Sequence, residues 1–521
     1  MTSEATSEPA PAGPPANVFF SARTMGGVPW MLLSKIVLFA VYFGISVIAV
    51  RTLGSAQYGV YSLCKNLSEY LVVVCGLGLN AALIRFLPEL EISRNRAGMI
   101  RLLRRAFALQ ALAAVICGLA LQAALPLLNR VFKVSFGHLL LLTAILVAAV
   151  VAKGFANDTL TALFRSRDVC LLGIGQGLLW VALLYVGMRF RPEVGTVLAA
   201  QAVSFAVAAL AGFALLVAHV RGLRWRSPPQ GIGRARVLRT ALPVMGGSLI
   251  RMLMDKYTEV FFLGAYFSSQ VVGIYDLGYS TPAIVIGLVP TAVQSLFLSG
   301  FAEAYTRDPN CLPRLVNACY KGLILIAVPL AAFGVFFAPQ AIVLLYGEGM
   351  RAAGPVASAF CVFHVLPMVS IPLSMAITAR EKNLDMLPML VLQVCLNLTL
   401  DIALIPHFGM AGAVAAVYGT YALTIPIRLR VVRRLIGGIY FPTGFLLRIA
   451  APSLILAGVP ALLAPRLSLP ALLGLGCAYL VAGAVCLRLF RLIHSADLRD
   501  FRSLGIGRLN RVLDLLAGVP T

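Results

Sequence analysis

Long apolar runs alternate with short polar segments along most of the chain. A helix rises ~1.5 Å per residue and a membrane has ~30 Å of hydrocarbon, so a run of about 20 apolar residues can span it. Fourteen runs meet or approach this length: 30–50, 61–84, 106–127, 138–158, 169–188, 194–218, 240–267, 277–301, 321–346, 352–376, 386–406, 410–427, 444–464 and 468–490. The pattern predicts an all-α integral membrane protein with about 14 transmembrane helices.

The polar segments between the runs define the expected organisation of the chain. None exceeds about twenty residues, which is too short for a soluble domain. We expect a disordered cytoplasmic tail at 1–22, six helices at 23–220, a basic cytoplasmic linker at 221–239, six helices at 240–434, two further helices at 435–490 and an amphipathic cytoplasmic tail at 491–521.

Composition supports the membrane assignment, since hydrophobic residues make up 60% of the 521 residues and charged residues only 12%. A net charge of +23 would suggest a nucleic-acid partner in a soluble protein. Here the positions of the cations instead alternate with the apolar runs. When cations near the run ends are counted with the adjoining segments, alternate connecting segments and the tails hold 32 of the 43 Lys and Arg, the other connecting segments hold seven, and four (Lys35, Lys65, Arg251 and Lys256) lie within runs. This asymmetry predicts cytoplasmic termini, attraction to anionic inner-leaflet lipids, and no nucleic-acid partner.

Two of the cationic segments are expected to be loops. One loop holds Lys153, Arg165 and Arg167, and the other holds Arg428, Arg430, Arg433 and Arg434. Arg85 and Glu89 are likewise expected to be loop charges at the end of the second run.

The seventh run is unusual because Thr240 to about Phe267 reads as one spanning helix and yet carries four ionisable residues. Arg251, Asp255 and Glu259 follow at i, i+4 and i+8, which places them on one helix face, with Lys256 about 100° away. A charge at the centre of a membrane helix costs about 2.5–3.5 kcal/mol, so these groups should avoid lipid. They form either a ladder of structural ion pairs or a hydrated site for a charged substrate or ion.

An internal repeat relates the two halves of the chain. Leu-Gly, a short turn and Gly-(Val/Ile)-Tyr occur at 53–61 after the first run and again at 263–275 after the seventh. Six runs separate the two copies, so both have the same orientation. Parallel repeats of six helices are typical of transporters built from two bundles.

Four stretches carry a family resemblance: RTLGSAQYGVYSL (51–63), GLGLNAALIRFLPE (76–89), ALPVMGGSL with the later VGIYDLGY, and NLTLDIALIPHFGMAGAVAA (397–416). Together they resemble the polysaccharide-export, Wzx-like flippases of the multidrug/oligosaccharidyl-lipid/polysaccharide superfamily. The resemblance implies two pseudo-symmetric six-helix lobes around a central cationic cavity, plus two C-terminal helices. It also implies a bacterial or archaeal inner membrane and alternating access.

In that family the substrate is an undecaprenyl-pyrophosphate-linked oligosaccharide, moved from the cytoplasmic to the outer leaflet for O-antigen or exopolysaccharide synthesis. The resemblance thus implies a lipid-linked oligosaccharide as ligand, polymerase or export machinery as partners, and H⁺ or Na⁺ coupling without another cofactor. Two alternatives stay open within the superfamily, a lipid II flippase and a cation-coupled small-molecule exporter. A membrane polysaccharide polymerase is a remote alternative, because the outer loops are too short for a catalytic domain.

Charged residues inside the runs are the candidate site residues. We expect phosphate contacts from Lys35, Lys65, Arg251 and Lys256, and ion coupling at Asp255, Glu69 and Glu259. Lys65 and Glu69 also have the i, i+4 spacing of a structural pair, Lys35 could instead extend to the headgroups, and Asp401 is expected to be structural. Gly246 and Gly247 are candidate hinge residues. No P-loop, no Cys-x-x-Cys and no metal-binding His spacing occurs, so no catalytic site is expected.

Overall fold

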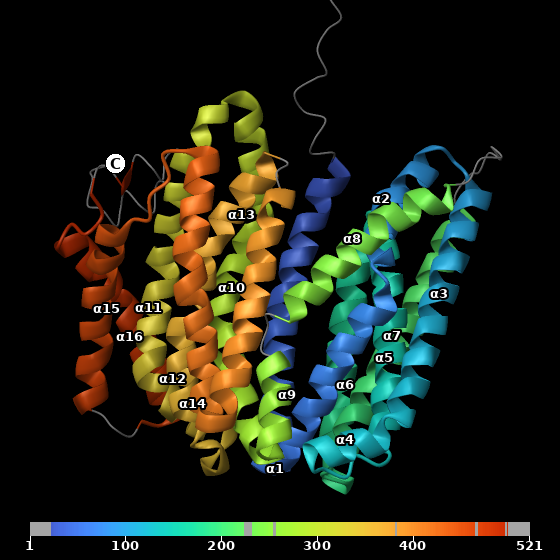
Figure 1. Cartoon of the computed structure of the whole chain (residues 1–521), viewed down its shortest axis with the longest axis horizontal. Helices are drawn as coiled ribbons and strands as arrows, with labels where there is room; N and C mark the ends of the chain where they lie inside the picture. The colour runs from blue at the N-terminus through green and yellow to red at the C-terminus, as the bar shows by residue number, and fades with distance from the viewer. Residues whose placement is uncertain are drawn as a thin grey trace, which may run out of the picture.

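The computed structural model describes residues 22–222, 232–253, 257–380, 383–463, 467–494 and 497–498. Within those residues every regular element is a helix (Figure 1), as the apolar runs predict. The start of α1 (Ala22–Gly76) and the end of α16 (Leu469–Leu489) lie at the same end of the molecule. We call this the basic end, because the arginine-rich helix ends lie there, and we call the opposite end, where α1 turns, the Gly54 end.

The described residues of the first half of the chain form seven helices. They are α1, α2 (Leu79–Ile92), α3 (Arg96–Ala123), α4 (Leu125–Phe132), α5 (Leu139–Ala162), α6 (Ser166–Phe190) and α7 (Val194–Gly222). α1 contains two membrane passes, because Gly54 has φ +70° and ψ 176° and interrupts the helix between them. Glycine suits this turn, since a Cβ atom strains a positive φ. α2 continues the second pass after a break at Leu77 and Gly78.

In the second half, nine α-helices lie within the described residues. They are α8 (Arg234–Met252), α9 (Tyr257–Tyr266), α10 (Ser269–Arg307), α11 (Leu312–Tyr346), α12 (Ala353–Phe363), α13 (Ser370–Ala379), α14 (Leu387–Ile436), α15 (Thr443–Leu463) and α16. Short 3-10 helices occupy Pro309–Cys311, Glu348–Met350, Pro367–Val369 and Asn383–Met386. α14 is also a double pass, because Gly409 with φ +56° interrupts it at the turn that the sequence predicts.

The number of passes agrees with the prediction of about fourteen. Ten helical segments of the described chain are long and apolar enough to cross a membrane. Two of them, Leu33–Gly76 and Leu387–Ile436, are the double passes of α1 and α14. α10, with 39 residues, adds one pass, and α8 together with α9 adds another.

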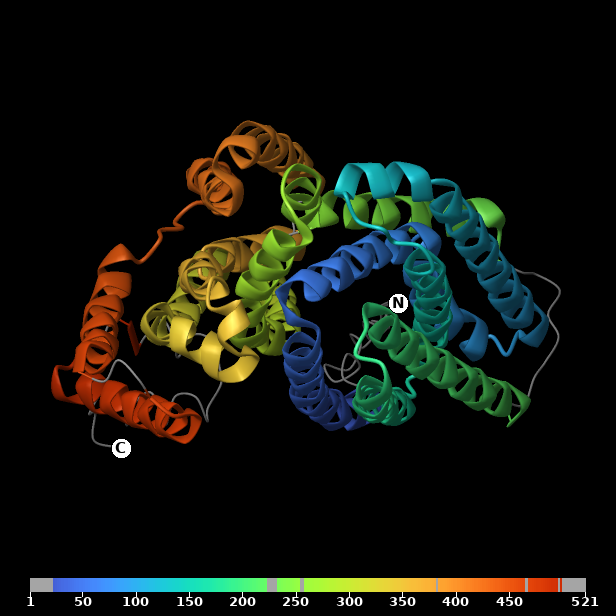
Figure 2. The same cartoon turned by 90° about the horizontal axis from the view of Figure 1, so that it is seen from below.

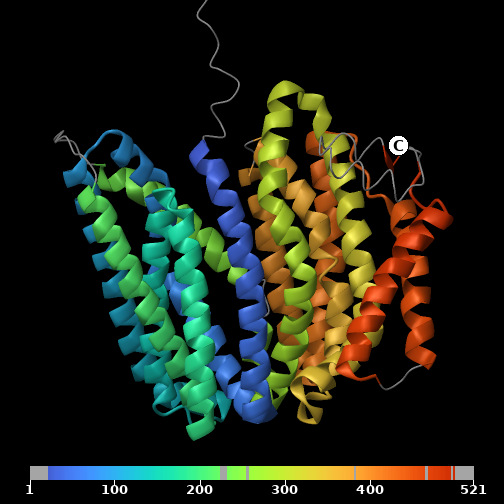
Figure 3. The ribbon, with the colours of Figure 1, turned by 180° about the vertical axis from the view of Figure 1, so that it is seen from behind.

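The helices gather in two bundles when they are viewed from the Gly54 end (Figure 2). α1 to α7 form the first bundle and α10 to α16 the second, with α15 and α16 at its outer edge (Figure 3). The bundles meet where α1 packs against α10. Gly59 of α1 and Gly273 of α10 lie in this contact, because a Cβ atom on Gly273 would be only 2.9 Å from the Gly59 nitrogen. The two copies of the sequence repeat therefore pair across the interface between the bundles.

The seventh pass is not the continuous helix expected over 240–267. α8 ends at Met252 and α9 begins at Tyr257, and residues 254–256 lie outside the described part of the chain. α8 packs against α1 and α2 of the first bundle, whereas α9 packs mainly against α14 and α10 of the second. Each half of this pass is thus attached to a different bundle. Arg251 and Glu259 are on separate helices, so the shared face predicted for them is wrong.

The segment after α16 packs on the second bundle. Lys321 Nζ of α11 lies 2.6 Å from Asp497 Oδ1, and both side chains are 5% exposed. Ile493 and Leu498 join an apolar cluster with residues of α11 and α15. Of the amphipathic tail expected at 491–521, this part is fixed to the bundle, and residues 499–521 lie outside the described residues.

Candidate substrate and ion sites

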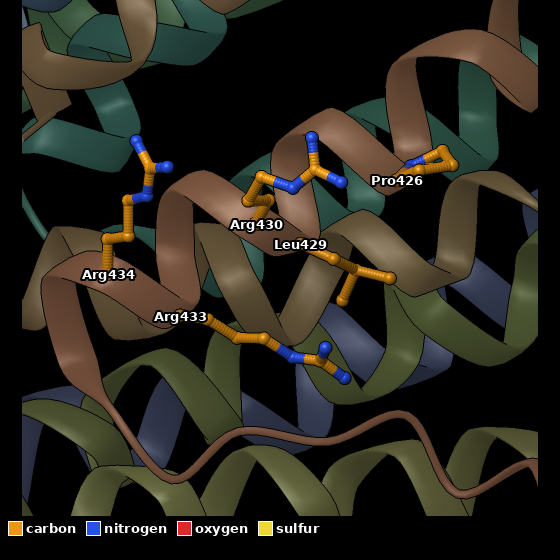
Figure 4. A pocket seen from close by; sticks show the side chains of 5 residues that line it. All are labelled: Pro426, Leu429, Arg430, Arg433 and Arg434. Atoms are coloured by element: carbon orange, nitrogen blue, oxygen red, sulfur yellow. The ribbon is translucent and has the colours of Figure 1, made fainter.

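A basic pocket lies beside the last three turns of α14, at the basic end. It has a volume of about 450 Å³ and is lined by Pro426, Leu429, Arg430, Arg433 and Arg434. Arg430 and Arg434, one turn apart, point to one side of the helix, and Arg433 points to the other (Figure 4). These arginines were expected in a loop, and that expectation is wrong because α14 continues to Ile436. Cations are favourable in this last turn, where the helix dipole is negative.

The arginines of this pocket have few partners that would neutralise their charge. Arg433 Nε donates a hydrogen bond to the Ile439 carbonyl at 2.8 Å. Arg428, which precedes the lining residue Leu429, donates to Gln393 Oε1 at 2.8 Å. In the described part of the chain, no carboxylate forms an ion pair with Arg428, Arg430, Arg433 or Arg434. A group of guanidinium groups without carboxylates is suited to bind a phosphate or pyrophosphate from outside the protein.

Two apolar pockets also lie in the second bundle. A pocket of about 450 Å³ shares Pro426 with it and continues along α14 past Ile425 to Tyr418. A second pocket, of about 470 Å³, lies between α11, α15 and α16 and is lined almost wholly by apolar side chains. Tyr479 closes one wall of it through hydrogen bonds to the Pro329 carbonyl at 2.9 Å and the Ser453 carbonyl at 3.4 Å. The second bundle thus offers both basic and apolar concave surfaces.

Two buried acidic side chains lie where α9 meets α14. Glu259 Oε1 accepts a hydrogen bond from Asn397 Nδ2 at 3.5 Å. Asp401, one turn after Asn397, is fully buried, and neither carboxylate oxygen has a hydrogen-bond partner among the described residues. Tyr275 of α10 is within electrostatic range of both carboxylates. A buried carboxylate that lacks hydrogen bonds is costly, so Asp401, which lies near Glu259, is suited to bind a proton or a small cation.

A third buried carboxylate lies at the interface between the bundles. Asp276 of α10 accepts a hydrogen bond from the Tyr58 hydroxyl of α1 at 3.2 Å, and both residues are buried. This bond is close to the Gly59–Gly273 contact. It couples the position of α1 to that of α10 through a charged group.

The residues predicted to contact phosphate are spread over separate passes. Lys35 is exposed on the first pass of α1, Lys65 is half-buried on the second, and Arg251 is exposed at the end of α8. Asp255 and Lys256 lie outside the described residues.

Lys65 and Glu69 do not form the structural pair considered for them. Both are half-buried on α1, and among the described residues neither takes part in an ion pair. Although Lys65 and Glu69 have the i, i+4 spacing that allows a salt bridge, the two side chains do not form one in this structure.

Three features of the site were missed by the sequence analysis. Lys153, expected in a loop, is buried within α5. Asp401, expected to be structural, has no hydrogen bond in the described chain that would give it a structural role. The Arg428–Arg434 group was counted only as a topology signal. The usable signal was that Lys153 and Asp401 both lie inside apolar runs, where an ionisable residue suggests function.

Comparisons with known proteins agree with this arrangement. The family model described as "Polysaccharide biosynthesis protein" matches residues 25–297, just over half of the 521-residue chain. The chain belongs to this family. The resemblance to polysaccharide-export flippases is therefore confirmed. No curated protein sequence matches the chain.

Solved structures show the fold that this family member adopts. A structure of "Lipid II flippase MurJ, inward closed conformation" has a TM-score of 0.71 at 12% identity and covers 89% of this chain and 99% of its own. An inward-facing multidrug resistance MATE transporter of the MOP superfamily has a TM-score of 0.59 at 17% identity, covering 79% and 98%. A structure of an outward-facing multidrug resistance MATE transporter of the same superfamily has a TM-score of 0.53 at 16% identity, covering 79% of this chain and 95% of its own. The family and the fold are those of multi-pass membrane transporters.

Proposed function

We propose that the protein is a flippase that moves a lipid-linked oligosaccharide, carried on undecaprenyl pyrophosphate, from the cytoplasmic to the outer leaflet by alternating access. The observation that carries this proposal is the basic pocket on α14, whose arginines form no ion pair with a carboxylate of the described chain. A pyrophosphate is doubly anionic or more and matches several guanidinium groups at once. Small cationic drugs would be repelled by the same pocket, so it favours an anionic cargo over an exported cation.

The apolar pockets support the lipid part of the substrate. A polyprenyl chain must remain in an apolar environment while its headgroup crosses the protein. The pocket between α11, α15 and α16 offers such a surface, and the pocket that shares Pro426 with the basic one lies next to the proposed phosphate site. In this proposal the headgroup contacts Arg430 and Arg434 while the lipid tail stays against apolar helices of the second bundle.

Lys35, Lys65, Arg251 and Lys256 are proposed to contact the phosphates later in the transport path. They lie on the first, second and seventh passes of the chain. The seventh pass is attached to both bundles through α8 and α9, so a change in the angle between the bundles would move Arg251 relative to α14. Alternating access needs two states of similar energy, and a pass shared by both bundles can exchange between them.

Orientation and coupling follow from charge. The basic end is proposed to face the cytoplasm of a bacterial or archaeal cell, because arginine-rich ends are retained there. The substrate would then enter at the arginines of α14 and leave at the Gly54 end.

For coupling to H⁺ or Na⁺, Glu259 with Asp401 is the strongest candidate, with Glu69 and Asp255 as further proposed groups. A carboxylate that is dry in one state and hydrated in the other changes its ion affinity between them.

Translocation in proteoliposomes tests the proposal. The purified full-length protein would be reconstituted with fluorescent undecaprenyl-pyrophosphate oligosaccharide, and its appearance in the opposite leaflet would be followed by accessibility to a membrane-impermeant enzyme. We expect wild-type protein to translocate it and R430A/R434A to lose the activity. R351A is the matched control, since Arg351 is exposed and, among the described residues, pairs only with Glu348 three residues earlier. Wild-type rates in R430A/R434A would refute the phosphate site.

A lipid II flippase is the second candidate, and the fold similarity to MurJ favours it. Lipid II also carries an undecaprenyl pyrophosphate, so the arginines of α14 would bind either headgroup. Competition in the same assay separates the two. Two results together would favour this candidate. Excess unlabelled lipid II would inhibit transport of the labelled oligosaccharide substrate, and lipid II tested alone would be transported faster than the oligosaccharide substrate tested alone.

A further inference from the structure

Lys153 of α5 is a buried cation that the proposed transport site does not use. Its side chain is 9% exposed, Nζ donates a hydrogen bond to Gln176 Oε1 of α6 at 2.9 Å, and Nζ lies 4.6 Å from the centre of the Phe205 ring of α7. Within the described residues, it forms no ion pair with a carboxylate. In the part of the chain that the structure describes, the one polar partner of this amine is a neutral amide.

Lys321 provides an internal comparison. It is also buried and also lies near an aromatic ring, with Nζ 5.9 Å from the centre of the Phe445 ring. Its Nζ, however, is 2.6 Å from Asp497 Oδ1. The chain therefore places one buried lysine against a carboxylate and another against an amide. A counter-charge is the main difference between the two environments.

This difference decides which charge state each lysine can hold. A buried ammonium is stable when a carboxylate compensates for lost hydration, and it is strongly disfavoured when only a neutral acceptor is present. Lysine can escape this cost by losing its proton, which arginine cannot do. We propose that Lys153 is a proton site of the transport cycle, an amine while the first bundle is packed as in this structure and an ammonium when water reaches it.

Two hydrogen bonds link Lys153 through Gln176 to Tyr42 of α1, and we infer that water would follow this route. Gln176 Oε1 also accepts a hydrogen bond from the Tyr42 hydroxyl at 3.4 Å, and Tyr42 is 37% exposed. One side chain, Gln176, thus separates the buried amine from the partly exposed Tyr42. α1 lies tightly on α6 beside this route, since a Cβ atom on Gly177 would be 2.9 Å from Val41 Cγ1. A small shift of α1 away from α6 would open the route.

The charged groups near this site leave Lys153 without a counter-ion. On α1, Glu69 is within electrostatic range of the Tyr42 hydroxyl. Tyr42 is the hydrogen-bond partner of Gln176, so Glu69 is separated from Lys153 by both of these side chains. On α5 itself Asp158 is half-buried five residues away, on a different face of the helix. On α6, Asp168 is paired with Arg165. The described charged residues of α2, α3 and α7, including Glu89 and Arg221, form no ion pair with Lys153. Glu69 is thus the carboxylate that a movement of α1 would bring toward Lys153.

The proton step is simple to balance, and its role in transport rests on the proposed function. The amine takes up one proton from water on the side to which the first bundle is open, and no other bond changes. Repacking of α1 on α6 makes the ammonium costly, so the proton is released to water on the other side. One proton would cross for each cycle.

Amine labelling of the wild-type protein tests the proton site without any transport assay. Full-length protein in bilayers is treated with acetic anhydride, which acetylates only the unprotonated amine, at a series of values from about pH 6 to about pH 10. Mass spectrometry then reports each lysine separately. We expect Lys153 to become reactive at lower pH than the exposed Lys133, and Lys321 at higher pH. Reactivity of Lys153 at the same or higher pH than Lys133, or its complete protection throughout, would overturn the proposal.

Variants then connect the proton to transport. K153R keeps a permanent charge and K153M mimics the amine, so both should lose the stimulation of translocation by a pH gradient. K153M should still equilibrate substrate without a gradient. K133M is the control and should respond to the gradient as wild type does. A full gradient response in K153R would refute the proton site. If labelling shows a low-pH amine but no variant or wild type moves the oligosaccharide, the proton site stands and the proposed substrate fails.

Discussion

A Cβ atom on Gly59 would lie 1.6 Å from the carbonyl oxygen of Ser269. The reciprocal contact is also present, since a Cβ atom on Gly273 would lie 2.4 Å from the carbonyl oxygen of Ser55. Each serine precedes the glycine of its own helix by four residues. Such reciprocity is what a two-fold axis between repeated bundles produces. α1 and α10 therefore touch backbone to backbone near the Gly54 end.

Replacing either glycine by alanine should separate these helices. No side chain can occupy the space taken by a carbonyl oxygen, so we expect G59A and G273A to cost about 1–3 kcal/mol, as for overpacked cores. Thermal unfolding of the purified protein measures this.

The matched control is G44A. Gly44 is on the same helix as Gly59, and a Cβ atom there would meet nothing within 4 Å. Because alanine favours a helix more than glycine does, G44A should melt at or slightly above the wild-type temperature. If G59A melts together with G44A, the direct backbone contact is not present in solution.

The sequence predicted the passes well, because hydropathy reports on the membrane. It predicted the repeat that contains Gly59 and Gly273 but not their contact, which depends on how α1 packs on α10. It could not predict where helices end. Hydropathy marks where a run leaves the hydrocarbon, but α14 continues as a helix through Arg430 and Arg434 to Ile436. The break between Met252 and Tyr257 was missed for the opposite reason, since the run from 240 to 267 stays apolar across it.

The candidate site was only partly predictable for a related reason. Side-chain periodicity predicts a shared face only within one continuous helix, so Arg251 and Glu259 were wrongly grouped. The partner of a buried charge comes from another helix, and the sequence does not give that pairing. Gln176 beside Lys153, and Asn397 beside Glu259, are visible only in three dimensions.

The link between α2 and α8 is a second testable contact. Arg236 donates two hydrogen bonds to Glu89, at 2.9 and 3.1 Å. Glu89 was expected in a loop but lies within α2, where it can hold the first half of the seventh pass. The pair is about half exposed, so we expect E89R to cost less than about 1 kcal/mol of stability. Its larger effect should be on translocation rate, and E89R/R236E should restore that rate. Failure of the double reversal would mean that the pair does not join these helices during transport.

Asp401 should carry the ion response of the second bundle. D401N removes a buried charge that has no hydrogen bond in the described chain, so we expect the variant to be at least as stable as wild type. In the wild type, binding of Na⁺ or a proton to the folded state should raise the melting temperature, and this shift should vanish in D401N. E193Q, an exposed loop variant, is the control and should keep the shift. A shift that persists in D401N would assign ion binding elsewhere.

The ion pair between Lys321 and Asp497 should anchor the segment after α16. D497N leaves the buried Lys321 ammonium without its carboxylate, which typically costs about 3–5 kcal/mol. We therefore expect a clearly lower melting temperature at neutral pH. E348Q removes a carboxylate from the Arg351–Glu348 pair, whose side chains are 72% and 68% exposed, and should change stability by less than about 0.5 kcal/mol. Equal melting of D497N and E348Q would show that the segment is not held by this pair.

The pH dependence of the same variant has a defined sign. Burial raises the pKa of Asp497, but hydrogen bonds from Lys321 and the His494 N–H, with the charges of Lys321 and Arg448, outweigh it and hold the pKa below its usual value. Because the folded pKa lies below the unfolded value of about 3.9, the carboxylate stabilises the fold above that pH. This contribution is lost as the pH falls through the folded pKa. The melting temperatures of wild type and D497N should therefore converge in acid, and a gap that stays constant down to about pH 3 would contradict the ionised pair.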